Sequence, residues 1–251
     1  MLPSLRIWLN HFEYHSEHHR DIGSDIASRL TAGERAAIAS SIATFQLGEQ
    51  SDGQRLMHAA ECFATRYAAP ELPRIIELLI GEEQRHARLL GAFMDAQGIA
   101  RKRHDWTDRV FRLLRGLAGF ELALHVLSTA ELIGIVYYRA LESATRCESL
   151  RLLCRMMVAD ELAHVGLEAE LLHALRAARP RWQRALQRLV YRAFFASAVL
   201  VVWLTHRKVL RRGGYRLASF RRSCRTQSSF YLRPWPRPRE LAPVEAERKA
   251  A

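Results

Sequence analysis

The sequence has little of what disulfide-rich, thiolate-ligated or membrane-spanning proteins need. The four cysteines in 251 residues form no C-x-x-C pair, which excludes a zinc-ribbon or iron–thiolate module. With so few cysteines in a chain of this length, we expect reduced thiols in a cytoplasmic protein. The first residues are rich in histidine and lack an apolar stretch, so they are not a secretory signal. The longest run without a charged side chain, residues 193–205, is too short for an ordinary membrane span.

Acidic side chains are absent from one long stretch of the chain. Residues 1–170 carry 19 Lys and Arg against 23 Asp and Glu, whereas residues 171–239 carry 17 Lys and Arg and no acidic residue. The formal net charge of +12 therefore belongs to the C-terminal third, beside a nearly neutral body. Apolar residues make up 49% of the chain, which is enough to bury a sizeable core.

Strand patterns are nearly absent, and apolar residues recur every three or four positions, which is typical of long helices. We expect five helices, at residues 31–67, 71–97, 107–146, 148–178 and 182–210. The first begins at a capping box formed by Thr31 and Glu34, and Thr107 is the expected cap of the third. Long amphipathic helices must bury a face against one another, so the sequence predicts an all-α helix bundle.

This pattern divides the chain into four parts. Residues 1–30 form an N-terminal segment, and residues 31–179 form the four-helix bundle. Residues 180–212 form an additional apolar and basic helix. Residues 213–251 are basic and contain four prolines, which predicts an extended or disordered tail.

Two E-x-x-H segments each place a carboxylate and an imidazole on one helix face. Glu83 and His86 form the first, and Glu161 and His164 form the second. Residues three positions apart are neighbours on the surface of an α-helix. One E-x-x-H is common by chance, but two such motifs on alternate helices indicate that they belong to one functional site.

A glutamate on the preceding helix accompanies each of these motifs. Glu49 stands 34 residues before Glu83, and Glu131 stands 30 residues before Glu161. Both midpoints fall close to expected helix breaks, so each pair of glutamates reaches the same height in an antiparallel hairpin. Together the hairpins bring four glutamates and two histidines into one interior, the donor set of a carboxylate-bridged dinuclear metal site. Without a metal, so many buried carboxylates would be very costly.

With these motifs, residues 32–178 resemble the ferritin-like superfamily of di-iron carboxylate proteins. The resemblance implies a four-helix bundle with a long crossover between its second and third helices. It also implies two iron ions, with manganese or a mixed pair as alternatives, and it implies that Glu83 and Glu161 bridge them. The ligands that it implies are Glu49, Glu83, His86, Glu131, Glu161 and His164.

The residues before the two bridging glutamates are candidates for a supporting layer. The EEQRH segment resembles the D/E-E-x-R-H pattern of bacterial di-iron oxygenases, and the second motif resembles its D-E-x-x-H form, with Ala163 in place of arginine. In such sites the preceding acid orients the histidine of the other half through its second nitrogen. We therefore expect Asp160 to hold His86 and Glu82 to hold His164. Ordinary surface charges are the alternative.

Two further groups of residues are candidates. Tyr138 follows Glu131 by seven positions on the same helix face, as either a proton or electron relay at the site or a core tyrosine. His11, His15 and His18 recur at helical spacing near the N-terminus. They form either an adventitious metal site or, as we favour, a half-exposed helix face.

The apolar segment at 193–204 has arginines and lysines on both sides, and three interpretations of it remain open. The helix either packs across the bundle with its cationic ends in water, or lies in a membrane interface. In the second case, residues 181–225 contact anionic head groups. Nucleic-acid binding is disfavoured, because it explains the charge and leaves the apolar run unexplained.

The expected metal centre and its resemblance imply a di-iron oxidoreductase that activates O₂ or peroxide. Its electrons would come from another protein, because the chain has no iron–thiolate module. The alternatives are a peroxidase similar to rubrerythrin, a membrane-linked hydroxylase similar to the demethoxyubiquinone hydroxylases, and a ferroxidase or iron-handling protein. A scaffold without metal is a further alternative. We expect a cytoplasmic protein, either free or peripheral at the inner face of the membrane, and a homodimer is compatible with the sequence.

Overall fold

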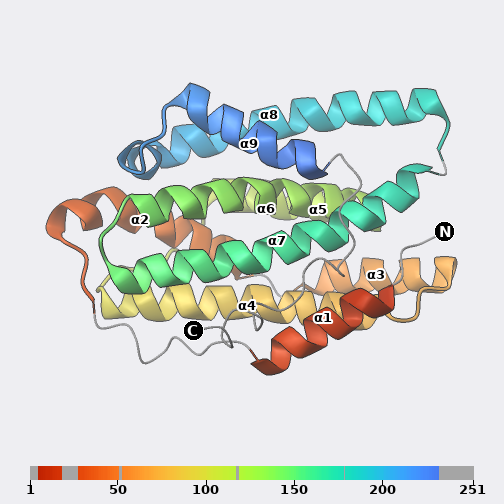
Figure 1. Ribbon diagram of the computed structural model, residues 1–251, viewed down its shortest axis with the longest axis horizontal. Helices are drawn as coiled ribbons and strands as arrows, with labels where there is room; N and C mark the ends of the chain where they lie inside the picture. Colours follow the sequence, from red (N-terminus) through yellow and green to blue (C-terminus); the bar gives the residue numbers. More distant parts are fainter. Residues whose placement is uncertain (1–4, 19–27, 51–52, 117–118, 178, 232–251) are drawn as a thin grey trace, which may run out of the picture.

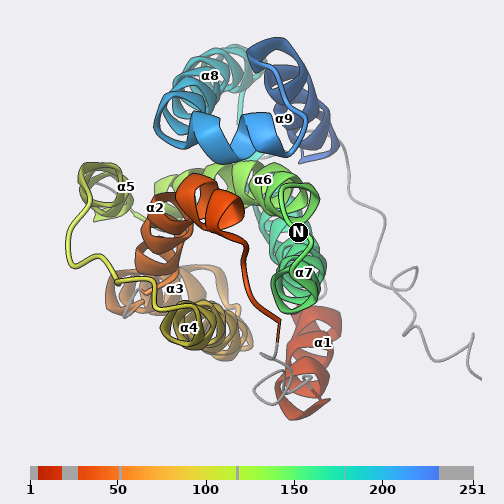
Figure 2. The same cartoon turned by 90° about the vertical axis from the view of Figure 1, so that its left-hand side faces the viewer.

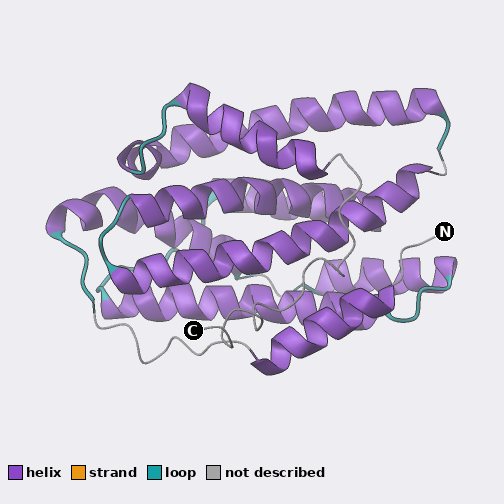
Figure 3. Cartoon of the chain, in the orientation of Figure 1, coloured by secondary structure: helices purple, strands orange, loops and turns teal. Residues whose placement is uncertain are grey.

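The computed structural model describes residues 5–18, 28–50, 53–116, 119–177 and 179–231, and all regular structure within these ranges is helical (Figure 1, Figure 3). The prediction of an all-α protein is confirmed. Seen end-on, four helices surround a common interior, with α8 and α9 outside α6 and with α1 on the opposite side (Figure 2). The four central helices are α2 (Ala32–Glu49), α4 (Leu72–Ala96), α6 (Phe120–Ser143) and α7 (Glu148–Ala177).

Contacts between the central helices fix their directions. Arg35, early in α2, bonds to the carbonyl oxygen of Gln97, whereas the later Gln46 donates to the carbonyl oxygen of Ala87, so α2 and α4 are antiparallel. α7 is antiparallel to α4 and, across a short turn, to α6. Since α4 and α6 therefore run the same way, the chain must return along the bundle between them. Residues 97–119 make this connection and include α5 (Trp106–Gly116).

The prediction of one unbroken first helix is wrong, because the structure has α2 followed by α3 (Gln54–Tyr67). The chain leaves the helical conformation at Gln50, and Gly53 has a φ of 67°, in the left-handed region. A Cβ atom at Gly53 would lie 2.6 Å from Ile80 Cδ1, so only glycine fits. Glycines inside a periodic apolar pattern do not by themselves reveal such a break. The break makes Glu49 the last residue of α2.

The predicted third helix is also divided, into α5 and α6. Gly119 precedes the first residue of α6, and the buried Phe120 begins a new apolar face. Thr107 does not cap α5 as expected. The carboxylate of Asp105 accepts the backbone N–H of Thr107 at 2.9 Å, which is the usual contact of an N-cap residue with the second helical residue.

The fifth predicted helix is α8 (Arg181–Arg212), and it is followed by α9 (Leu217–Tyr231). The expectation of an extended or disordered tail is wrong for residues 217–231. Phe220 and Cys224 are fully buried on one face of α9, and the Phe220 ring lies 6.0 Å from that of Trp203 on α8. The many arginines of this segment lie outside that narrow apolar face, which is why composition alone indicated a tail. Residues 232–251 lie outside the described residues.

In the described part of the chain, two helices are long and apolar enough to cross a membrane by length and composition, α6 and α8. In α6, 83% of the most apolar 18-residue segment is buried in the protein, as expected of a core helix. In α8, only 33% of the corresponding segment is buried. The expectation that residues 193–205 are too short for a membrane span counted only residues without charge. A membrane-spanning segment can contain a few charged residues, so α8 is long enough by this measure. The exposed apolar side chains of α8 are Trp182, Leu186, Leu189, Val190, Leu200 and Leu204.

The N-terminal segment contributes α1 (Leu5–His18), which packs along α4 and α7 (Figure 1). Trp8 and Phe12 are fully buried, and Trp8 Nε1 donates to Glu170 Oε2 at 3.0 Å. These contacts place α1 as an outer wall of the bundle beside the two E-x-x-H helices. Residues 1–4 and 19–27 of the predicted N-terminal segment lie outside the described residues.

Candidate metal centre

The six residues expected to bind metal lie together in the interior of the bundle. Their donor atoms form two groups, and in each group one atom per residue lies within 4.8 Å of the others. The first group is Glu49, Glu83, His86 and Glu161, and the second is Glu83, Glu131, Glu161 and His164. Glu83 and Glu161 belong to both groups, as bridging carboxylates between two ions would. Metal binding itself stays a prediction.

Each of the four central helices contributes to this cluster. α4 and α7 contribute the two E-x-x-H motifs, α6 contributes Glu131, and α2 contributes Glu49 at its last residue. The C-terminus of a helix carries a partial negative charge, which disfavours a second negative charge nearby. A cation next to Glu49 would relieve that repulsion.

Both histidines turn Nδ1 toward the cluster, because Nε2 is held from outside. His86 Nε2 lies 2.9 Å from Asp160 Oδ2, and His164 Nε2 lies 2.8 Å from Glu82 Oε2. These are the two cross-pairs expected from the sequence. His164 Nδ1 lies 3.2 Å from Glu83 Oε1 without the alignment of a hydrogen bond. An outer acid that fixes one ring nitrogen and leaves the other for a metal is the usual arrangement around a histidine ligand.

The two outer acids differ in the cation that pairs with them. Arg85 Nη2 lies 2.6 Å from Asp160 Oδ2, whereas His15 Nδ1 on α1 lies 3.1 Å from Glu82 Oε1. Ala163 stands at the position that corresponds to Arg85 in the second motif, so His15 supplies the second positive partner. Burial opposes ionisation of Glu82, but the hydrogen bonds from His15 and His164 outweigh it and lower its pKa.

The role of His15 was not foreseen from the sequence. Its side chain is 34% exposed, so the expected half-exposed face describes its burial, but the ring is bonded to the site. Its stacking partner His11 lies 5.5 Å away between ring centroids. No spacing along the chain connects His15 to Glu82, because only the packing of α1 on α4 brings them together.

Glu168, a further carboxylate beside the cluster, was also not foreseen from the sequence. It is fully buried on α7 against Glu131, and neither of its oxygens accepts a hydrogen bond of normal geometry. Burial raises the pKa of Glu168 to about 8. Its signal was present in the sequence, since Glu161, His164 and Glu168 stand at positions i, i+3 and i+7 of one helix face.

Burial and mutual repulsion raise the pKa of several acids in the cluster. For Glu49 the largest cause is burial, followed by the charges of Glu83 and Glu161. For Glu131 it is again burial, followed by the charge of Glu168. A buried cluster of this many carboxylates is stable only if it binds protons or cations. The site therefore favours the uptake of positive charge.

Tyr138 touches the cluster directly. Its hydroxyl donates a hydrogen bond of 2.6 Å to Glu49 Oε1, and the residue is 1% exposed. Burial and the neighbouring Glu49 raise its pKa well above the usual value, so the phenol stays protonated. Tyr138 thus lies at the border of the site, and its role as a relay stays a prediction.

Unpartnered buried atoms show that the donor set fits metal ions. Oxygen and nitrogen atoms without a hydrogen-bond partner among the described residues belong to Glu83, His86, Glu131, Glu161 and His164. Each such atom costs free energy unless something binds it. Carboxylate oxygens with one imidazole for each group suit divalent iron, manganese or cobalt better than they suit thiolate-preferring metals.

Comparison with known proteins adds no family to this description. No protein-family model, curated protein or solved structure matches the chain significantly.

Proposed function

We propose that this protein binds two divalent metal ions, iron or manganese, in the bundle interior and activates O₂ or peroxide there. The observation that carries the proposal is the sharing of Glu83 and Glu161 by two groups that each add one histidine and one further glutamate. Four-helix bundles with two E-x-x-H motifs hold dinuclear carboxylate centres in this way. The single long connection between α4 and α6 is also the connectivity of ferritin-like folds, which supports the resemblance noted in the sequence.

The protein's own groups orient the donors and hold protons, while the bound metals would supply the redox chemistry. Asp160 and Glu82 fix the two imidazole rings, so that Nδ1 of each ring is presented inward. Tyr138 Oη holds a proton against Glu49 Oε1. Glu168, with a pKa of about 8, holds another beside Glu131. Each proton lies beside a terminal carboxylate of the cluster, Glu49 or Glu131, which could take it up by moving.

Electrons would come from a separate donor protein. Of the four cysteines, Cys62 is exposed, and Cys147, Cys154 and Cys224 are buried as free thiols. They lie on α3, in the turn before α7, on α7 and on α9, and make no iron–thiolate group among the described residues. An oxidoreductase of this kind therefore needs an external partner.

A membrane-linked hydroxylase is the second candidate, favoured by the incomplete burial of α8. Trp182 and Leu189 on this helix are 66% and 67% exposed, amid arginines that suit anionic head groups. This candidate would have the same metal centre and would act at the inner face of a membrane. A ferroxidase shares the centre too, but it would assemble into a cage, which light scattering would reveal.

The reaction is tested by the optical spectrum of the protein loaded anaerobically with Fe²⁺, before and after exposure to O₂ or peroxide. We expect new near-ultraviolet or visible absorption in the wild type and its loss in E83A, because Glu83 belongs to both donor groups. E77A, which alters an exposed glutamate of α4, is the matched control and should react as the wild type does. An unchanged spectrum in iron-loaded wild type would contradict the proposed activity.

A further inference from the structure

An apolar cavity of about 140 Å³ reaches the metal cluster from the side of α5 and α8. The carboxylates of Glu49, Glu83, Glu131 and Glu161 lie at its inner end. Its walls include Phe111 on α5 and Val202 on α8, together with aliphatic side chains of α6. A dry apolar cavity of about 150 Å³ in another protein holds one benzene molecule. This cavity therefore has room for one ring-sized group beside the carboxylates.

Glycine keeps this space open. Gly134 lies in the interior of α6 and lines the cavity. A Cβ atom there would meet only the Tyr138 ring, at 3.9 Å, so a larger side chain would extend into the hollow without a backbone clash. Glycine in the interior of a helix lowers its stability. Gly134 therefore keeps the cavity open at a cost in the stability of α6.

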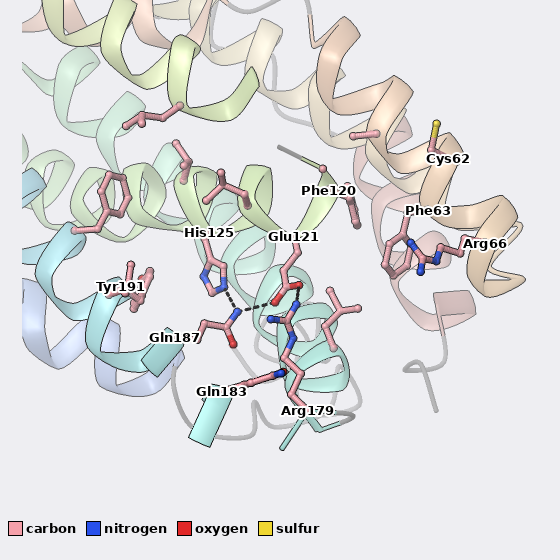
Figure 4. A pocket seen from close by; sticks show the side chains of 18 of the residues that line it. Cys62, Phe63, Arg66, Phe120, Glu121, His125, Arg179, Gln183, Gln187 and Tyr191 are labelled. Carbon is pink, nitrogen blue, oxygen red and sulfur yellow. Dashed lines mark hydrogen bonds and ion pairs between the residues drawn. The ribbon is translucent and has the colours of Figure 1, made fainter. Parts of the chain in front are cut away.

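A much larger open groove, of about 1550 Å³, adjoins the cavity (Figure 4). Val126 lines both hollows, and Phe111 of the cavity wall lies 6.5 Å, between ring centroids, from Phe194 of the groove wall. The groove lies between α3, α6 and the first half of α8. The two hollows thus follow one another along α6.

The groove is lined by polar side chains of α3, α6 and α8 and by apolar side chains of the same helices. Among the polar ones, Gln187 Nε2 donates to Glu121 Oε1 at 2.6 Å and lies 3.1 Å from His125 Nε2, and Arg179 pairs with Glu121 (Figure 4). These four side chains largely satisfy one another. Among the apolar ones, Leu186 and Val190 remain 55% and 60% exposed. Apolar side chains left uncovered along a groove are typical of a binding site for an apolar chain.

We propose that the substrate is one molecule with a ring-sized apolar head and an aliphatic tail. The head occupies the cavity against the carboxylates of the cluster, and the tail lies along α6 and α8 in the groove. This inference rests on the proposed function, because the cavity matters only if metals occupy its inner end. A protein partner could cover the groove but could not enter a cavity of about 140 Å³, whereas a tailed ring fills both hollows.

The test measures binding rather than turnover. Full-length protein is loaded with Co²⁺, whose unpaired electrons broaden nearby ¹⁹F signals, or with Zn²⁺, which does not. A series of 1-fluoro-4-alkylbenzenes with growing alkyl chains serves as the probe. We expect broadening only with Co²⁺, since the ring lies beside the metals, and affinity that rises about fourfold per added methylene until the groove is filled.

Matched variants separate the two hollows. G134L fills the cavity and should abolish the broadening while cobalt still binds, and A130L, at an exposed residue of the cavity rim, replaces it if G134L does not fold. V190E should remove the gain with chain length. L189E is its control, because Leu189 is 67% exposed on the same helix and does not line the groove.

Each outcome decides between distinct conclusions. Bound cobalt without broadening, or affinity that does not depend on chain length, would overturn the substrate class and leave the metal centre standing. Broadening that survives both G134L and A130L would also overturn it, because the ring would then lie elsewhere. A chain that binds no cobalt would overturn the proposed function, and the substrate inference with it.

Discussion

At the scale of single residues, the interior of the bundle is organised by proton and charge uptake. Hydrogen bonds from His15 and His164 lower the pKa of Glu82, and Asp160 is held by Arg85 and His86, whereas the inner acids Glu49, Glu131 and Glu168 have raised pKa values. The two outer acids thus fix the orientation of the imidazole rings. The three inner acids favour the exchange of bound protons for cations.

Metal binding should therefore release protons. Glu168, with a pKa of about 8, carries a proton at pH 7 when no cation is present, and burial also raises the pKa values of Glu49 and Glu131. A cation favours their ionised forms, so we expect at least one proton released per chain on Co²⁺ addition in weakly buffered solution with an indicator dye. E168Q should release fewer protons. Equal release by wild type and E168Q would contradict the assigned position of Glu168.

The residue scale also shows how far sequence could go. The i, i+3 spacing of each E-x-x-H identified four residues that the fold brings together, because helix geometry alone decides which side chains share a face. The spacing within each hairpin added Glu49 and Glu131. Glu168 was within reach of the same rule. His15 was not, since its contact with Glu82 depends on where α1 packs.

At the scale of helices, boundaries depended on local chemistry that periodicity does not report. The left-handed Gly53 and the start of α6 after Gly119 divided helices that the apolar pattern had joined. The narrow apolar face of Phe220 and Cys224 made α9 from a segment whose charge indicated disorder. The capping box of Thr31 and Glu34, in contrast, was found from sequence because both partners lie within one turn.

Glu34 links the start of α2 to the turn between α6 and α7 and gives a pH-dependent contribution to stability. It caps α2 and also accepts hydrogen bonds from Thr145 Oγ1 and the Arg146 backbone N–H, at 3.0 and 2.7 Å. Burial opposes its ionisation, but these bonds and those from Thr31 lower its pKa to about 2. A lowered pKa in the folded state contributes stability above the unfolded value of 4.5, and this contribution is lost as pH falls toward 2.

We therefore expect E34Q to lower the free energy of unfolding by about 1–2 kcal/mol at pH 7. The difference from wild type should shrink as pH falls from 4.5 toward 2, because the unfolded wild type then takes up a proton at Glu34 while the folded state does not. Urea unfolding at several pH values measures it. A difference that stays constant down to pH 2 would mean that the charge of Glu34 contributes nothing.

The junction of α8 and α9 should tolerate no side chain at Gly213. A Cβ atom there would lie 2.2 Å from the carbonyl oxygen of Ala140 on α6, although the backbone of Gly213 is not in the left-handed region. We expect G213A to destabilise the protein by about 1–3 kcal/mol, because the end of α8 must move away from α6. G81A, at an exposed helical glycine with nothing within 4 Å, should instead stabilise by about 1 kcal/mol. Urea unfolding of both variants compares them.

At the scale of the whole molecule, the reactive part and the basic part are separate. The net charge of +12 comes from residues 171–239, most of which form α8 and α9 on one side of the bundle, whereas the Glu/His cluster lies in a body with more acidic than basic residues. The fold class and the cluster could be predicted because repeated motifs and helical periodicity report them. The role of the exposed apolar face of α8 could not, because no described residue of this chain covers it.

The membrane interpretation makes a direct prediction. The wild type should sediment with vesicles that contain anionic lipid and be released as salt rises, since arginines of α8 and α9 would contact the head groups. R221E/R222E, on the exposed side of α9, should weaken this binding and leave the unfolding transition unchanged. Binding that does not depend on anionic lipid would exclude the interface and leave α8 as a packing helix.

The central claim is that the Glu/His cluster holds two metal ions, and metal analysis of the purified chain tests it most directly. We predict about two equivalents of iron or manganese per wild-type chain, and at most one in E161A, because Glu161 belongs to both donor groups. The metals should also raise the melting temperature, since they bind only the folded state. A folded chain that binds no metal after reconstitution, and that is unchanged by E161A, would contradict the account.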